Sequence, residues 1–241
     1  MKSTAQFLQR KNPYRRTVRA CYLGYVSQAI VCCYVPLLFT RFQQQYGIPL
    51  YKITALITVC FVLQLFVDFA AAFFVDKIGY RVAAAGGNAF TALGLCAMTF
   101  LPEILPDPFT GLLLSVLIYS TGAGLLEVVV SPIVEACPSD NKEGTMSLLH
   151  SFFCWGQVGV VALSTLFFGT VGIEHWKILV RLWSVIPFAN AVWFLTVPIY
   201  RPAGDDAESG SVKRLLTLPA FWLFFALMLC AGASEVAVSQ W

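Results

Sequence analysis

Three carboxylates lie inside long apolar stretches of the sequence, where a charged group is costly. They are Asp68, Glu127 and Glu235. A carboxylate at membrane depth usually faces an aqueous cavity or a polar partner, which makes it a functional-site hypothesis by default. Burial favours the protonated form of a carboxyl group, so such a side chain can load and release a proton as a cavity opens to each side in turn. These residues therefore predict a pathway for a proton or a solute.

The first two carboxylates lie at different depths. At a rise of about 1.5 Å per residue, Glu127 lies about 15 Å from Cys137, near the middle of a membrane. By the same rise Asp68 lies about 12 Å from Asp76, and Gln64 shares its helix face. Two roles stay open for each carboxylate: contact with a proton or a solute, or a structural hydrogen bond that braces a neighbouring helix.

Neutral polar side chains extend this candidate pathway. His150 is followed closely by Phe152 and Trp155, and this stretch either faces the cavity, where it could stack on a ring-shaped solute, or forms a packed helix interface. Gln28, in the first apolar run, is similar in kind. The chain has only two histidines, and none of its eight cysteines shows C-x-x-C spacing. We therefore expect neither a metal site nor a cofactor.

The composition places these residues in a membrane. Hydrophobic residues make up 58% of the chain and charged residues 12%, and the mean hydropathy is +0.73, which leaves too little polar surface for a water-soluble domain. A membrane-spanning helix needs about 20 mainly apolar residues. Six such runs occur, at 20–40, 51–75, 82–101, 109–134, 146–171 and 177–199. A seventh begins at Pro219 and is cut off at Trp241, so we expect an all-α membrane protein that is a fragment of a longer chain.

Loops and charges divide the chain into four parts. We expect a basic N-terminus at 1–19, a six-helix bundle at 20–199, a polar flexible linker at 200–218, and the start of a further helix at 219–241. Most of the 16 basic residues fall in the N-terminus, in the loop after the second span and in the linker. The positive-inside rule then places the N-terminus in the cytoplasm of a multi-pass cell-membrane protein.

Two prolines favour an internal repeat. Halves of many transporters consist of two three-helix units with opposite topology, whose first helices carry matching irregularities. Pro36 and Pro132 each lie near the exit end of the first span of a triplet. The six spans are therefore predicted to form two inverted three-helix repeats.

The loop after the second span resembles a motif of the major facilitator superfamily, G-x-x-x-D-R-x-G-R-R. The sequence matches its acid at Asp76, a basic residue at Lys77, and its later Gly and Arg at Gly79 and Arg81, whereas Ala72 replaces the first glycine. A glycine permits a tight turn, and the charged groups can pair with helix ends to latch one conformation. The resemblance implies half of a 12-helix transporter with a latch in this loop.

Two further stretches resemble the fucose permease branch of that superfamily. They are 127–132 (EVVVSP) and 150–156 (HSFFCWG), near the family patterns E-T-A-A-N-P and L-N-L-A-Q-x-F-N-x-x-G. The resemblance implies that Glu127 is a proton-linked glutamate and that His150 stands where the family has a sugar-contacting glutamine.

The first span departs from that family. Val31 and Cys32 occupy positions at which the family has Asn and Asp. The second protonatable group of the family is therefore absent, and Asp68 is a candidate substitute.

The predicted function is secondary active transport of a small solute, a sugar, by proton-coupled alternating access. Its partners would be the solute, protons, the lipid bilayer and a C-terminal six-helix half, and not nucleic acid. An efflux carrier for drugs or metabolites is an alternative, although the fifth span lacks a Gly-x-x-x-Gly-Pro run. A seven-helix receptor is another, although its N-terminus would lie outside. No catalytic triad, paired histidine ligands or phosphate-binding glycine loop is present in the sequence, so we do not expect an enzyme.

Overall fold

The computed structural model of the chain describes residues 12–200 and 216–240. The chain divides into two compact units, residues 1–201 and 202–241, and each is described by itself. The residues described are helical, without a strand, which agrees with the predicted all-α class. Most of the predicted linker at 200–218, and residues 1–11 of the predicted N-terminus, lie outside the described residues.

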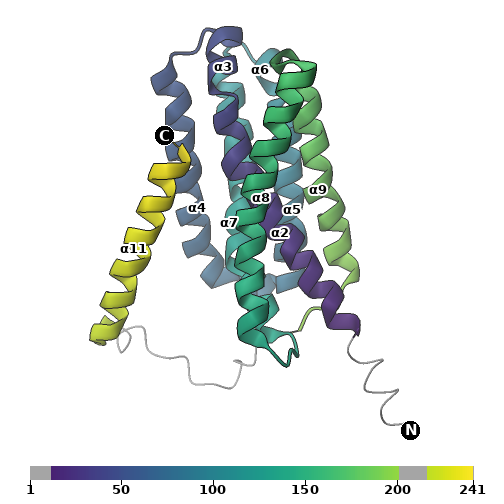
Figure 1. The fold of residues 1–241 in the computed structure, drawn as a ribbon, viewed down its shortest axis with the longest axis vertical. Coiled ribbons are helices and arrows are strands. Elements are labelled where there is room, and N and C mark those ends of the chain that lie inside the picture. Colours follow the sequence, from purple (N-terminus) through teal and green to yellow (C-terminus); the bar gives the residue numbers. More distant parts are fainter. Residues whose placement is uncertain (1–11, 201–215, 241) are drawn as a thin grey trace. The chain divides into compact units, whose positions relative to one another are not determined.

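The first unit is a bundle of six long helices that run up and down in turn (Figure 1). They are α2 (Asn12–Leu37), α4 (Leu50–Ile78), α5 (Tyr80–Met98), α7 (Pro108–Ala136), α8 (Lys142–Val171) and α9 (Trp176–Thr196). Short helices α3 (Phe39–Tyr46), α6 (Leu101–Ile104) and the 3-10 turn η1 (Ile173–His175) join them. The second unit contains α11 (Pro219–Gln240).

Five helices of the described chain are long and apolar enough to cross a membrane, and they correspond to five of the six predicted spans. The exception is α5, which has 19 residues and is rich in Ala and Gly. Its small residues serve packing, because α5 lies against both α7 and α9. A Cβ atom added to Gly122 of α7 would overlap the backbone of Gly87 in α5. Small residues at such crossings let helix backbones approach closely.

The ends of several predicted spans need correction, and those of the first and the sixth span are examples. The first span was expected at 20–40, but α2 begins at Asn12, so that Arg15, Arg16 and Arg19 lie on the helix. It also ends at Leu37, soon after Pro36, and α3 continues as a separate helix from Phe39. A proline inside a helix removes a backbone donor and clashes with the preceding turn. The sixth span was expected to reach residue 199, but α9 ends at Thr196.

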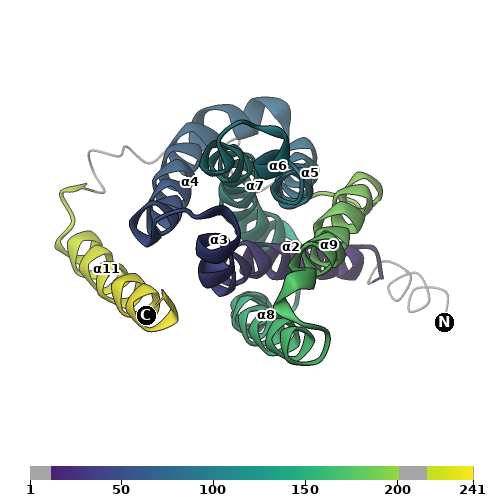
Figure 2. The same cartoon turned by 90° about the horizontal axis from the view of Figure 1, so that it is seen from above.

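The first three long helices, α2, α4 and α5, form one triplet, and α7, α8 and α9 form the other. The two triplets pack in a similar way. Helices α2 and α7 lie side by side at the centre, α4 packs mainly on α7, and α8 packs mainly on α2 (Figure 2). Thus the second helix of each triplet packs on the first helix of the other. The second helices also end alike, at Gly79 (φ 87°, ψ 143°) and Gly172 (φ 99°, ψ 146°). These features agree with two related three-helix units, and the inverted repeat itself stays a prediction.

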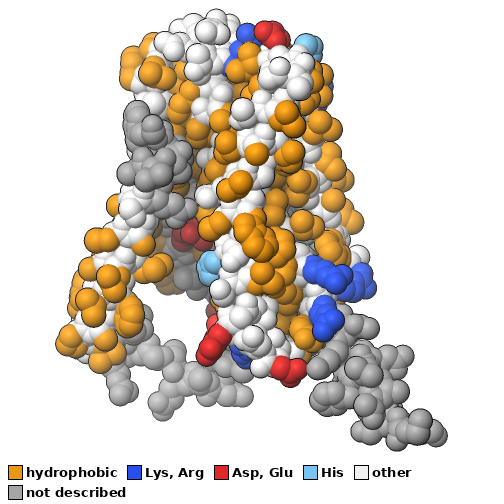
Figure 3. Space-filling view, in the orientation of Figure 1, with side chains coloured by type: hydrophobic (Ala, Val, Ile, Leu, Met, Phe, Trp, Pro, Cys, Tyr) orange, Lys and Arg blue, Asp and Glu red, His pale blue; other side chains and the backbone are white. Residues whose placement is uncertain are grey.

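Charged side chains and buried polar side chains occupy different parts of the first unit. Most of the charged side chains visible on the first unit lie towards its two ends, with mainly hydrophobic side chains between them (Figure 3). Inside, the Asn190 amide of α9 donates to Ala20 O in α2 and to Asn88 Oδ1 in α5, each at 3.1 Å. These bonds link three helices in the buried core, where polar groups are satisfied by partners within the protein.

Capping fixes the start of α7. The Asp107 carboxylate accepts bonds from the Thr110 hydroxyl at 2.7 Å and from the N–H groups of Thr110 and Phe109 at 3.1 Å and 3.3 Å. The Thr110 hydroxyl is the main cause that lowers the pKa of Asp107 below its usual range, and the two backbone bonds add to it. This side chain therefore caps α7 as a carboxylate.

Candidate functional site

Glu127 lies on α7 and is joined to α2 by a hydrogen bond. Gln28 Nε2 donates to Glu127 Oε2 at 3.1 Å. Gln28 is 7% exposed, whereas Glu127 lies on an exposed face of the first unit. Its neighbours Leu126 and Val129 are buried in the core, so Glu127 lies at the edge between the buried and the exposed faces of α7. The structure thus brings two predicted residues together between the first helices of the two triplets.

A second contact follows one turn along the same helix pair. The hydroxyl groups of Tyr25 in α2 and Ser131 in α7 lie 2.9 Å apart, and either can donate. Neither residue was predicted for the site. Helical spacing is the signal that could have found them, since Tyr25 lies one turn from Gln28 and Ser131 one turn from Glu127.

Asp68 of α4 approaches the same part of α7. A Cβ atom on Gly124, one turn before Glu127, would lie 3.3 Å from Asp68 Oδ1, so the glycine makes room for the carboxylate. Asp68 Oδ1 is buried and has no hydrogen-bond partner among the described residues. A buried oxygen without a partner is costly, which leaves Asp68 ready to accept a bond from a ligand.

His150 of α8 lies against Tyr25, with ring centres 5.5 Å apart. The His150 side chain is exposed, and the Tyr25 hydroxyl contacts Ser131 as described. His150 of α8 therefore contacts the group of polar side chains formed by Gln28, Tyr25, Glu127, Ser131 and Asp68, which we call the cluster.

The aromatic residues after His150 divide between two environments. Phe152 stacks on Tyr22 of α2, with ring centres 4.4 Å apart and an angle of 13° between planes. Trp155 contacts the Phe152 ring edge to face at 5.4 Å and is itself 61% exposed. Phe152 thus forms part of a packed helix interface, whereas Trp155 presents its ring to the outside of this unit.

The family model of the Major Facilitator Superfamily matches residues 21–241, nearly the whole chain. The chain belongs to the major facilitator superfamily. It is accordingly a multi-pass membrane protein of a family of transporters, which are in general not enzymes. The predicted resemblance to the superfamily is confirmed, and the fucose permease branch stays a proposal.

Two remaining pathway residues of this superfamily member lie elsewhere. Gln64 is 5% exposed and its Nε2 lies 3.5 Å from Cys60 Sγ, within α4. The Ser120 hydroxyl of α7 donates to the same sulfur at 3.0 Å, so Gln64 belongs to the packed interface of α4 and α7. Glu235 lies on α11 in the second unit, and its side chain is outside the described residues.

The loop that carries the superfamily motif forms a tight joint between α4 and α5. Gly79 has a φ of +87°, a conformation that residues with a side chain rarely adopt. Arg81 Nη1 donates to Leu195 O at 2.7 Å, which satisfies a carbonyl in the last turn of α9. Asp76 and Lys77 are exposed at the end of α4. The motif therefore connects two helix ends through Arg81.

The cluster of this major facilitator chain can exchange protons and bind hydroxyl groups. Glu127 and Asp68 supply carboxylates, and Gln28, Tyr25 and His150 supply neutral donors and acceptors. Among the described residues no group of three His, Cys, Asp or Glu side chains could hold a metal ion. The side chains that the structure brings together can form hydrogen bonds and transfer protons.

Proposed function

We propose that this superfamily member carries a sugar across the membrane together with protons, by alternating access. The observation that carries the proposal is the hydrogen bond between Gln28 and Glu127, with the unpartnered Asp68 oxygen beside it. A carboxylate bond from an amide is charge-assisted and roughly twice as strong as the bond to a neutral acid. Loading a proton on Glu127 therefore loosens a link between α2 and α7.

The neighbouring side chains suit a sugar. Hydroxyl groups of a sugar can bond to Glu127 and His150, whose side chains are exposed on the first unit. An apolar compound would leave these polar groups without partners, which is costly. This surface favours sugar transport over efflux of an apolar compound.

The proposed cycle needs more than one bundle. Alternating access rocks one bundle against another around a fixed site near the bilayer midplane. We propose that a second six-helix half supplies the opposite wall, with Glu235 on its first helix, and that the cytoplasmic loops close through Asp76, Lys77 and Arg81. The basic residues of α2 would hold the N-terminus in the cytoplasm of a cell membrane.

Replacing Glu127 by Gln tests the proton coupling. In the carrier reconstituted in liposomes, Glu127→Gln should abolish sugar accumulation driven by a proton gradient, because an amide cannot release a proton. Counterflow exchange of the same sugar should persist, because exchange needs no net proton movement. Glu135→Gln is the matched control, since Glu135 is an exposed acid two turns along the same helix.

The outcomes separate the parts of the proposal. Unchanged gradient-driven accumulation in Glu127→Gln would remove the coupling role of Glu127. Counterflow for none of a panel of hexoses and pentoses would remove the sugar.

A further inference from the structure

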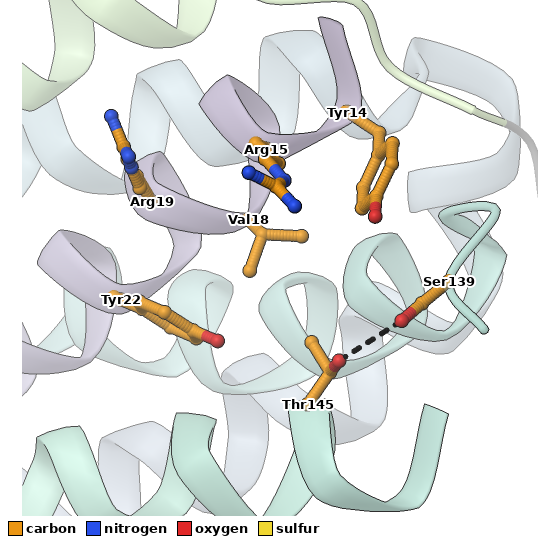
Figure 4. Close-up of a pocket in the computed structure, with 7 residues that line it drawn as sticks. All are labelled: Tyr14, Arg15, Val18, Arg19, Tyr22, Ser139 and Thr145. Atoms are coloured by element: carbon orange, nitrogen blue, oxygen red, sulfur yellow. Dashed lines mark hydrogen bonds between the residues drawn. The ribbon is translucent and has the colours of Figure 1, made fainter. Parts of the chain in front are cut away.

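A cavity lies at the end of the first unit where α2 begins. It has a volume of about 310 Å³. Helix α2 lines it with Tyr14, Arg15, Arg19 and Tyr22, the connection from α7 to α8 lines it with Ser139, and the first turn of α8 lines it with Thr145 (Figure 4). None of these residues belongs to the proposed solute site.

The hydroxyl groups of Ser139, in the α7–α8 connection, and of Thr145, in the first turn of α8, are already engaged. Thr145 Oγ1 donates to Asn141 O at 2.8 Å, which leaves Ser139 to donate to Thr145 across 3.2 Å. Asn141 Oδ1 caps α8 by accepting from Gly144 N at 2.8 Å. This side of the cavity is therefore a fixed polar wall next to the positive end of the α8 dipole.

The groups free to bind a ligand come from α2. Figure 4 shows Arg15 between the rings of Tyr14 and Tyr22, whose oxygens both point towards the side of Ser139 and Thr145. Arg19 lies farther along the helix, and its guanidinium group points away from that side in this conformation. Both arginines are exposed and make no ion pair among the described residues. The available donors are thus two guanidinium groups and two phenols.

The charge of the cavity favours an anion. No carboxylate lines it, although Asp140 of the connection and Glu143 in the first turn of α8 lie nearby in the sequence. Arginine presents donors in a planar fork that matches two oxygens of a phosphate group. The apolar side chain of Val18 also lines the cavity, where α2 passes from its basic start into its apolar span. At such a level the phosphate groups of membrane lipids lie beside a membrane protein.

We propose that this cavity binds a phosphate group, which belongs either to the headgroup of an anionic lipid or to free phosphate in solution. The guanidinium group of Arg15 takes two phosphate oxygens, Arg19 compensates the remaining charge, and the phenols of Tyr14 and Tyr22 donate to the outer oxygens. The site is independent of the solute pathway, so its occupancy does not require Glu127.

Native mass spectrometry of the purified chain in detergent micelles tests the proposal. We expect the protein to retain phosphatidylglycerol in preference to phosphatidylcholine. The double variant Arg15→Gln/Arg19→Gln should bind phosphatidylglycerol at least about tenfold more weakly, because hydrogen bonds to charged groups are lost. Arg16→Gln is the matched control, since Arg16 is an exposed arginine of the same turn that does not line the cavity.

A measurement on the unaltered protein avoids any folding defect of the variants. Phenylglyoxal modifies exposed arginines, and the modified positions can be mapped by peptide mass spectrometry. Phosphatidylglycerol or inorganic phosphate should protect Arg15 and Arg19 and leave Arg16 reactive. Protection by the lipid alone identifies a headgroup site, and protection by inorganic phosphate in the absence of lipid identifies a site for free phosphate. Equal protection of Arg16, or no protection by either ligand, would overturn the proposal.

Discussion

A single methyl group at Gly122 tests the close crossing of α5 and α7. An added Cβ atom would lie 2.5 Å from Thr91 N and would also overlap Gly87 O, whereas ordinary van der Waals contact begins at 3.4 Å. Both neighbours include backbone atoms, so the helices would have to separate by about 1 Å over a crossing that small residues keep close. Overpacking of this kind typically costs about 1–3 kcal/mol.

Gly159→Ala is the control that separates the cost of overpacking from the effect of alanine on helix stability. Gly159 lies on α8, and a Cβ atom there would meet nothing within 4 Å. Replacing Gly by Ala in a helix gains about 1 kcal/mol in either place, so the difference between the variants reports the crossing. We expect Gly122→Ala to unfold about 1–3 kcal/mol more easily than Gly159→Ala in an SDS titration followed by circular dichroism. Equal free energies of unfolding would refute the close crossing.

Two further predictions concern hydrogen bonds, one between α2 and α7 and one at the start of α7. Tyr25→Phe removes the contact with Ser131 and should lower the free energy of unfolding by about 1 kcal/mol, whereas Tyr51→Phe, at a tyrosine that is 70% exposed, should change nothing; equal stability of the two variants would contradict the contact. Asp107→Ala should destabilise the protein at neutral pH, where the Asp107 carboxylate accepts its bond from Thr110. Because the folded pKa of Asp107 is lowered, the wild-type advantage is present above the ordinary aspartate pKa of about 3.9 and is lost as the pH falls through the lower folded value. Unfolding titrations across the acid range measure it, and an advantage that persisted at the lowest pH would argue against carboxylate capping.

The apolar runs predicted the helices because length and hydropathy decide which segments can cross a membrane. They predicted the ends less well. The start of α2 at Asn12 was missed since its first turns are basic and lie outside any apolar run. In α5 the sequence signal was weak because alanine and glycine serve packing there and contribute little hydropathy.

The sequence predicted individual residues of the candidate site, but it did not predict which of them contact one another. Glu127 and Asp68 stood out because a carboxylate is rare in an apolar run. Their partners depend on which faces of α2, α4 and α7 meet, and no spacing within one helix contains that information. Gln64 shows the limit: it shares the face of α4 that packs on α7, as its spacing from Asp68 predicts, yet that places it inside the packed contact.

The two glycine joints, Gly79 and Gly172, bear on the predicted repeat of the two three-helix units. Their neighbours in sequence differ, Ile78 and Tyr80 in one case and Val171 and Ile173 in the other, but their backbones turn alike. A tandem duplication leaves this mark when side chains diverge and the turn between two helices is kept. An alignment of the triplets should therefore be anchored on these glycines, and it then needs a gap to pair Pro36 with Pro132, because the two pairs are separated by different lengths of chain.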